Sequence, residues 1–167
     1  MSPDPTPLEL FEAWDVPALL SGINGWAPFV GAGIEVEHLA EDAGEVRVRM
    51  PLTEANANLV GVQFGGSLYA MTDPFLMILL MRRLGPGYRV WDRSASVEFL
   101  RPGTGEVRAT VRVTEDEIAA VRAATADGAP HRPTWVVDVT DETGEVVARV
   151  TKELWVRRTP TDPDETR

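Results

Sequence analysis

The sequence contains no cysteine among its 167 residues. This absence excludes disulfides, a thiol nucleophile and thiolate metal sites, and it fits a reducing compartment such as the cytoplasm. Only two histidines are present, and no cluster of histidines and carboxylates has the spacing of a metal site. We therefore expect neither a bound metal nor a cofactor.

Basic residues are also scarce. The chain has 16 lysines and arginines against 26 aspartates and glutamates, a net charge of -10 and an isoelectric point near 4.6. This charge repels a phosphate backbone on average, so nucleic acid is not an expected partner. Residues 1–7 lack the basic region and the apolar core of a signal peptide. We expect an untargeted, cytoplasmic protein that does not bind a membrane.

The length and the 44% hydrophobic content fit one globular domain. We expect this domain to cover residues 8–158, after a flexible N-terminus at 1–7 and before a disordered tail at 159–167. Apolar residues recur at helical spacing from Leu8 to Trp14 and are followed by Pro17. This pattern predicts a short amphipathic helix at the start of the domain.

Strand patterns occupy six segments of the chain. Val46, Val48 and Met50 alternate with charged residues, which is typical of a strand with one buried face. Similar alternation between turn residues predicts strands at 33–39, 45–50, 94–99, 107–113, 135–139 and 146–156. The Ala-rich segment 115–127 is expected to form a short helix or an irregular lobe.

Residues 65–84 form a long segment that is apolar nearly all round, as in a helix buried on most sides. Asp73 and Pro74 interrupt the segment, which leaves it short of the roughly 20 apolar residues that span a bilayer. Pro74 also removes a main-chain N–H, which predicts a kink beside Asp73. An antiparallel sheet of about six strands around this central helix gives an α+β fold, and its exposed edges favour a homodimer, or a dimer of such dimers.

The segment from Asn58 to Asp73 carries the candidate chemistry. At Gly65 and Gly66, main-chain N–H groups and the helix dipole favour negative charge developing on a ligand carbonyl oxygen. Asp73 follows Gly66 by seven residues, so the two lie roughly 10 Å apart along one helix at 1.5 Å per residue. One helix cannot bring both groups to one carbonyl. We therefore expect Asp73 of one subunit to approach Gly66 of the other in a two-fold dimer.

This segment resembles the hotdog-fold acyl-CoA thioesterases. The likeness is to the phenylacetate-degradation type and to thioesterase domains whose helix opens with Phe-Gly-Gly-Ser-Leu-Tyr. The first type carries Asn-x-x-Gly-x-x-His-Gly-Gly, with an acidic residue nine positions after the histidine. This pattern is matched at Asn58, Gly61, Gly65, Gly66 and Asp73. Phe64 replaces the histidine.

The resemblance implies a hotdog fold and hydrolysis of an acyl thioester of coenzyme A or of another carrier. It assigns polarisation of the thioester carbonyl to the N–H of Gly66, the role of base or nucleophile to Asp73, and orientation of water or substrate to Asn58. The acyl chain is expected in a tunnel lined by Tyr69, Met77 and Leu80. Further candidate contacts with the substrate are Gly65, Gln63, Phe64 and Ser67, of which Gln63 could supply a polar group in place of the missing histidine.

Each of these candidates also has a purely structural interpretation. Asp73 can cap a helix that begins at Pro74, the paired glycines can serve a turn or close packing, and Asn58 can bind its own loop. Two other functions stay open. One is a non-catalytic hotdog protein that binds acyl-CoA or lipid. The other is a hotdog dehydratase that acts on acyl thioesters, although such dehydratases usually resemble one another in a pair of histidine and acid, and no histidine lies in this motif.

Overall fold

The computed structural model describes residue 11 and residues 15–159. Its elements are α2 (Val16–Asn24), α3 (Ala27–Ala32), β1 (Glu35–Leu39), β2 (Glu45–Met50), α4 (Gly65–Ala70), α5 (Phe75–Leu84), β3 (Tyr88–Phe99), β4 (Val107–Arg112), α6 (Glu115–Ala124), β5 (Thr134–Asp141) and β6 (Val146–Arg158). The flexible N-terminus expected at 1–7 lies outside these residues. So do most of the expected opening helix and residues 160–167 of the expected tail.

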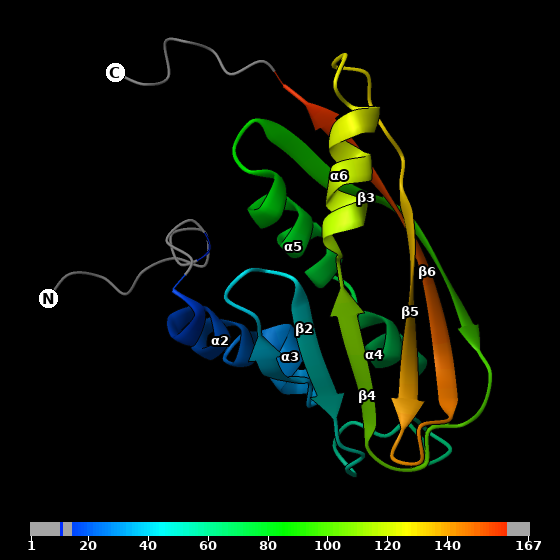
Figure 1. The fold of residues 1–167 in the computed structure, drawn as a ribbon. Coiled ribbons are helices and arrows are strands. Elements are labelled where there is room, and N and C mark those ends of the chain that lie inside the picture. Colours follow the sequence, from blue (N-terminus) through cyan, green and yellow to red (C-terminus); the bar gives the residue numbers. More distant parts are fainter. Residues whose placement is uncertain (1–10, 12–14, 160–167) are drawn as a thin grey trace, which may run out of the picture.

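The six strands form one antiparallel sheet in the order β1-β2-β4-β5-β6-β3. Figure 1 shows α4 and α5 along one face of this sheet, with α2 and α3 beside the β1 and β2 side. α6 lies near the upper end of the view and contacts α5. The predicted sheet of six strands around a central helix is confirmed.

The core lies between the sheet and the central helices. In β4, the buried residues Val107, Ala109 and Val111 alternate with exposed ones, so the strand turns one apolar face inward. α4, α5 and the turn between them contribute Leu68, Met71, Phe75, Leu76, Leu79 and Leu80 to the same core. Burial of these side chains supplies the main hydrophobic stabilisation of the fold.

The central helix is interrupted for four residues. α4 ends at Ala70, α5 begins at Phe75, and residues 71–74 form a turn between them. Pro74 has no N–H to continue the helical ladder, and the Asp73 N–H donates to the Ala70 carbonyl at 3.3 Å. The predicted kink beside Asp73 is confirmed, and it divides the expected helix over 65–84 into two segments.

Pro17 lies at the beginning of a helix. Asp15 caps α2 because its Oδ1 accepts a hydrogen bond from the Ala18 N–H at 3.1 Å, and proline is favoured in the first turn of a helix. Apolar spacing alone predicts only the segment before Pro17, so α2 and α3 are not anticipated from the sequence.

A capping box fixes the start of α6. The Thr114 hydroxyl accepts from the Glu117 N–H at 3.2 Å, and the Glu117 carboxylate accepts from the Thr114 N–H at 2.7 Å. The segment 115–127 therefore contains a regular helix rather than an irregular lobe. Among the described residues, no helix is long and apolar enough to cross a membrane.

Candidate active site

Asp73 lies in the turn between α4 and α5, and its side chain is 45% exposed in the single chain. Its Oδ1 accepts a hydrogen bond from the Tyr69 hydroxyl at 2.6 Å and another from the Lys152 ammonium at 2.8 Å. Within residues 15–159, Oδ2 has no hydrogen-bond partner. One carboxylate oxygen is therefore fixed and the other is free.

The structure does not use Asp73 as a helix cap. The N-cap residue of α5 is Pro74, and no side chain makes a capping hydrogen bond there. The carboxylate instead binds Tyr69 and Lys152, which lie outside α5. The helix-capping interpretation of the Asp-Pro pair is therefore not supported.

Lys152 lies in β6, opposite Ala95 of β3 and Trp135 of β5, and its side chain is only 1% exposed. The ammonium donates to Oδ1 and to the main-chain oxygen of Asp73, and it forms an ion pair with Asp92 Oδ2 at 2.8 Å. Three oxygen atoms thus surround a group that has three N–H donors. Such pairing is what makes a buried charge tolerable.

Asp92 lies in β3 beside a bulge in the pairing with β6, between Asp92 and Ser94. Bulges bend a strand and redirect its side chains, and they recur next to active sites. The Asp92 side chain is 31% exposed. It also borders an open hollow of about 350 Å³ that is lined by Trp91, Asp92, Arg93 and Trp155.

Tyr69 completes the cluster. Its burial, the hydrogen bond to Asp73 and the negative charges of Asp73 and Asp92 raise the pKa of Tyr69 well above its usual range. The hydroxyl therefore stays protonated at neutral pH and remains a donor to Asp73. The Lys152 ammonium lies 5.8 Å from the centroid of the Tyr69 ring, within the range of a cation–π interaction.

Gly65 and Gly66 are the first two residues of α4. Their N–H groups have no carbonyl within the helix to bind, and no side chain caps this end. Both positions are also tightly packed, because a Cβ on Gly65 would lie 3.0 Å from Phe99 Cζ and one on Gly66 would lie 2.6 Å from Phe64 Cε1. The glycine pair therefore serves close packing and still leaves two N–H groups at the helix start.

Asn58 binds its own loop. Its Oδ1 accepts from the N–H groups of Val60 and Val62, at 3.0 Å and 3.2 Å. Its Nδ2 has no hydrogen-bond partner in the part of the chain that the structure describes. One half of the amide is thus structural and the other half can still bind a ligand.

Gln63 is not placed to donate to a thioester carbonyl. Its side chain is buried, and Nε2 donates to the carbonyls of Met50 and Gly105, each at 3.0 Å. Oε1 is the one buried side-chain polar atom of the described residues without a partner, and it can only accept. Both N–H groups of Gln63 thus tie the loop to neighbouring segments, and the expectation that Gln63 supplies a polar group in place of the missing histidine stays a prediction.

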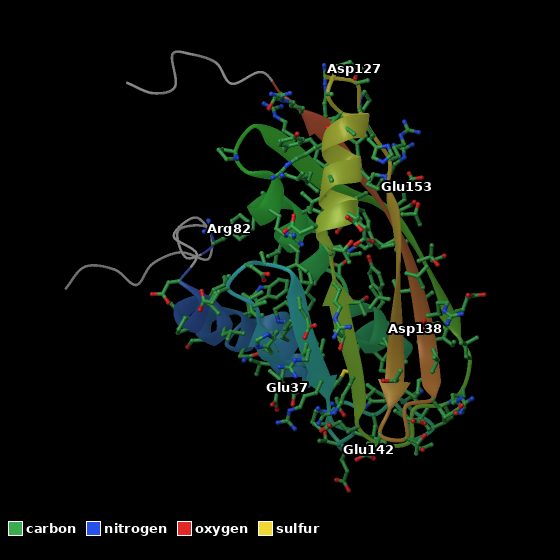
Figure 2. All side chains as sticks on the ribbon, in the orientation of Figure 1. Glu37, Arg82, Asp127, Asp138, Glu142 and Glu153 are labelled. Atoms are coloured by element: carbon green, nitrogen blue, oxygen red, sulfur yellow. The ribbon has the colours of Figure 1, made fainter. Side chains whose placement is uncertain are left out.

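The remaining candidates differ in accessibility. Phe64 is 54% exposed, Met77 is half-buried, and Ser67 and Leu80 are buried. The acyl tunnel stays a prediction, and in the single chain Leu80 belongs to the closed core. Glu37, Asp127 and Glu142 lie on separate parts of the surface (Figure 2), and Glu37 forms an ion pair with Arg108 at 3.0 Å. No group of carboxylates or histidines in the described residues could hold a metal ion.

Lys152 and Asp92 are the members of the cluster that the sequence reasoning missed. Two signals point to Lys152. It is the only lysine of the chain, since the other fifteen basic residues are all arginines. It also stands between Val150 and Leu154, at an inward position of β6 where the alternation calls for an apolar residue. No comparable signal in the sequence marks Asp92, because charged residues are common on strands at the edge of a sheet.

A family model described as a domain of unknown function (DUF4442) matches residues 19–156. The chain belongs to this family. No curated protein matches its sequence significantly. The DUF4442 match covers every described element from α2 to β6 in whole or in large part.

Solved structures resemble this DUF4442 chain closely in fold. A protein of unknown function from Pseudomonas aeruginosa, described as a probable thioesterase, has a TM-score of 0.73 at 24% identity, covering 92% of this chain and 97% of that one. A thioesterase from Haemophilus influenzae has a TM-score of 0.61 at 17% identity, with coverage of 87% and 93%. The PaaI protein from the phenylacetic acid degradation operon of E. coli has a TM-score of 0.58 at 16% identity, with coverage of 88% and 93%. The predicted hotdog fold is thereby confirmed.

Proposed function

We propose that this protein hydrolyses an acyl thioester, carried by coenzyme A or by another thiol. The observation that carries the proposal is the accessibility and hydrogen bonding of the Asp73 carboxylate. This carboxylate is accessible, one oxygen is fixed by two side chains, the other oxygen is free, and no helix start uses it as a cap. The thioesterases among the structures of the same fold support this reaction class.

Asp73 would act through Oδ2. As a base, it takes a proton from a water molecule whose oxygen attacks the thioester carbonyl carbon; the C–S bond then breaks, and the acid and the thiol leave. As a nucleophile, it attacks that carbon itself, the C–S bond breaks and the thiol leaves; water then hydrolyses the resulting mixed anhydride, which releases the acid and returns the Asp73 carboxylate. The Gly66 N–H stabilises the developing oxyanion, and the free Nδ2 of Asn58 orients the water or the substrate. Gly65, Phe64, Ser67, Tyr69 and Met77 remain the proposed surroundings of the acyl group.

The proposed enzyme is a homodimer with sites formed between subunits. β3 is twelve residues long, lies at the edge of the sheet and is exposed over most of its length. Trp91, Phe99 and Leu100, on or just after this strand, are each more than half exposed. A long unpaired edge with exposed apolar side chains favours pairing with a second copy. Such pairing offers a way to combine Asp73 with Gly66 of another subunit. The lack of cysteine fits a cytoplasmic location.

The test is hydrolysis of a panel of acyl-CoAs by the full chain, with a thiol reagent to detect the free coenzyme A. We expect at least one member to be cleaved, and sedimentation to give a dimer or a dimer of dimers. A panel without any cleavage would contradict the proposed reaction.

A second candidate function is acyl-CoA binding without catalysis. Phe64 favours it, because this residue replaces the motif histidine and its ring lies against Gly66. An acyl-CoA that raises the melting temperature but is not turned over would select this function over hydrolysis.

A further inference from the structure

Lys152 is the most deeply buried charged residue that the structure describes, and the proposed chemistry does not use it directly. The chain places arginine at every other basic position but lysine at this one. A planar guanidinium presents its donors in a fixed fork, whereas an ammonium is a compact charge with three donors that point apart. The site offers three separate oxygens, two from Asp73 and one from Asp92. Lysine is the cation whose shape matches this set.

We propose that Lys152 is a positioning residue that fixes Asp73 for the proposed hydrolysis, on which this inference rests. Lys152 binds both the carboxylate and the main-chain oxygen of Asp73, so it holds the side chain and the turn at 71–74 together. Tyr69 donates to the same Oδ1, which leaves Oδ2 as the reactive oxygen. With 1% of its side chain exposed, Lys152 acts through Asp73 and not on the substrate.

Asp92 anchors the ammonium from the other side. Its ion pair with Lys152 joins β3 to a side chain that belongs to β6. Paired strands are a more rigid support than a loop. The free oxygen of Asp73 is thus located relative to the sheet, although Asp73 itself lies in a turn.

The kinetic test compares Lys152→Met with Arg149→Met. Arg149 lies on the same strand, and its ion pair with Asp138 at 2.7 Å faces the other side of the sheet, so both changes remove one paired cation from β6. In Lys152→Met we expect kcat to fall about 100-fold, the effect of a misplacement of about 1 Å. KM should stay within about twofold, because ground-state binding is not removed. Arg149→Met should keep the wild-type kcat, and a Lys152→Met enzyme with wild-type kcat would overturn the inference.

A second measurement needs no thioesterase activity. Because the full chain has one lysine, labelling with ¹⁵N-lysine gives a single side-chain ammonium signal in NMR spectra. We expect this signal to be protected from exchange with water, to shift in Asp92→Asn and in Asp73→Asn, and to stay unchanged in Arg149→Met.

The two measurements separate the two claims. Fast exchange of the ammonium protons in the wild type, or an unchanged signal in Asp92→Asn, would overturn the role of Lys152 whatever the activity. A protected signal in a protein that cleaves no acyl-CoA would support the clamp on Asp73 and refute the proposed reaction.

Discussion

Replacing Asn56 with alanine is expected to lower the free energy of unfolding by about 3 kcal/mol. Asn56 is 8% exposed and uses both ends of its amide. Oδ1 accepts from the N–H and the hydroxyl of Thr53 at 2.8 Å and 3.0 Å, and Nδ2 donates to the carbonyls of Ala32 and Pro51 at 2.9 Å and 2.8 Å. These bonds tie the loop before α4 to the end of α3.

The magnitude follows from the two carbonyls that lose their donor. A buried acceptor left without a partner costs about 1–3 kcal/mol, and since both of these hydrogen bonds are partly buried, about 1.5 kcal/mol is expected for each carbonyl. The groups of Thr53 add little, because Thr53 is exposed and water can replace the amide there. For a chain of this length each kcal/mol lowers the melting temperature by about 2–4 °C, so 3 kcal/mol corresponds to a fall of roughly 6–12 °C.

Asn58 provides a matched control two residues away. Its Oδ1 binds N–H groups in an exposed loop, so Asn58→Ala should cost less than about 1 kcal/mol. Urea unfolding followed by circular dichroism measures both variants. Equal losses in Asn56→Ala and Asn58→Ala would refute the reasoning, because it assigns the difference to burial and to complete pairing of the Asn56 amide.

Two further predictions concern stability alone. Thr114→Ala removes the capping box of α6 and should cost about 1 kcal/mol, whereas Thr114→Ser should keep most of the wild-type melting temperature; an unchanged melting temperature in Thr114→Ala would contradict the role of the cap. The hydrogen bond from Arg149 holds the pKa of Asp138 below its ordinary value of 3.8. The stability from this pair is therefore present above pH 3.8 and is lost as the pH falls through the lower folded pKa, so urea midpoints of wild type and Asp138→Asn should converge only in strong acid. A constant difference at all pH values would contradict it.

Five of the strands, β1, β2, β4, β5 and β6, could be predicted from the sequence because each has one solvent-facing side and one buried side. β3 is exposed over most of its length, and it begins six residues before the strand predicted at 94–99. β2 is found at the predicted residues, and β5 and β6 extend the predicted strands by a few residues at their ends. Alternation along one strand does not fix its neighbours, so the position of β3 at the edge beside β6 had to come from the structure. α2 was missed because a proline can follow one helix and begin the next.

The site was predicted in part. The carboxylate of Asp73 and the free N–H groups of Gly65 and Gly66 belong to one sequence motif, so these residues could be identified as candidates from the sequence. Lys152 lies 79 residues after Asp73, and only the pairing of β6 with the rest of the sheet brings them together. A lysine in a β-strand usually points to water. The inward position of Lys152 is therefore set by how β6 pairs with its neighbouring strands.

The role of Asp73 in catalysis is tested most directly by kcat for Asp73→Asn, measured with an acyl-CoA that the wild type cleaves. The amide keeps an oxygen to accept from Tyr69 and Lys152 but has neither a basic nor a nucleophilic carboxylate. We expect kcat to fall by at least about 100-fold, the usual contribution of a general base, while Asp138→Asn on the outer face keeps the wild-type value. An Asp73→Asn enzyme that is as fast as the wild type would contradict the central claim.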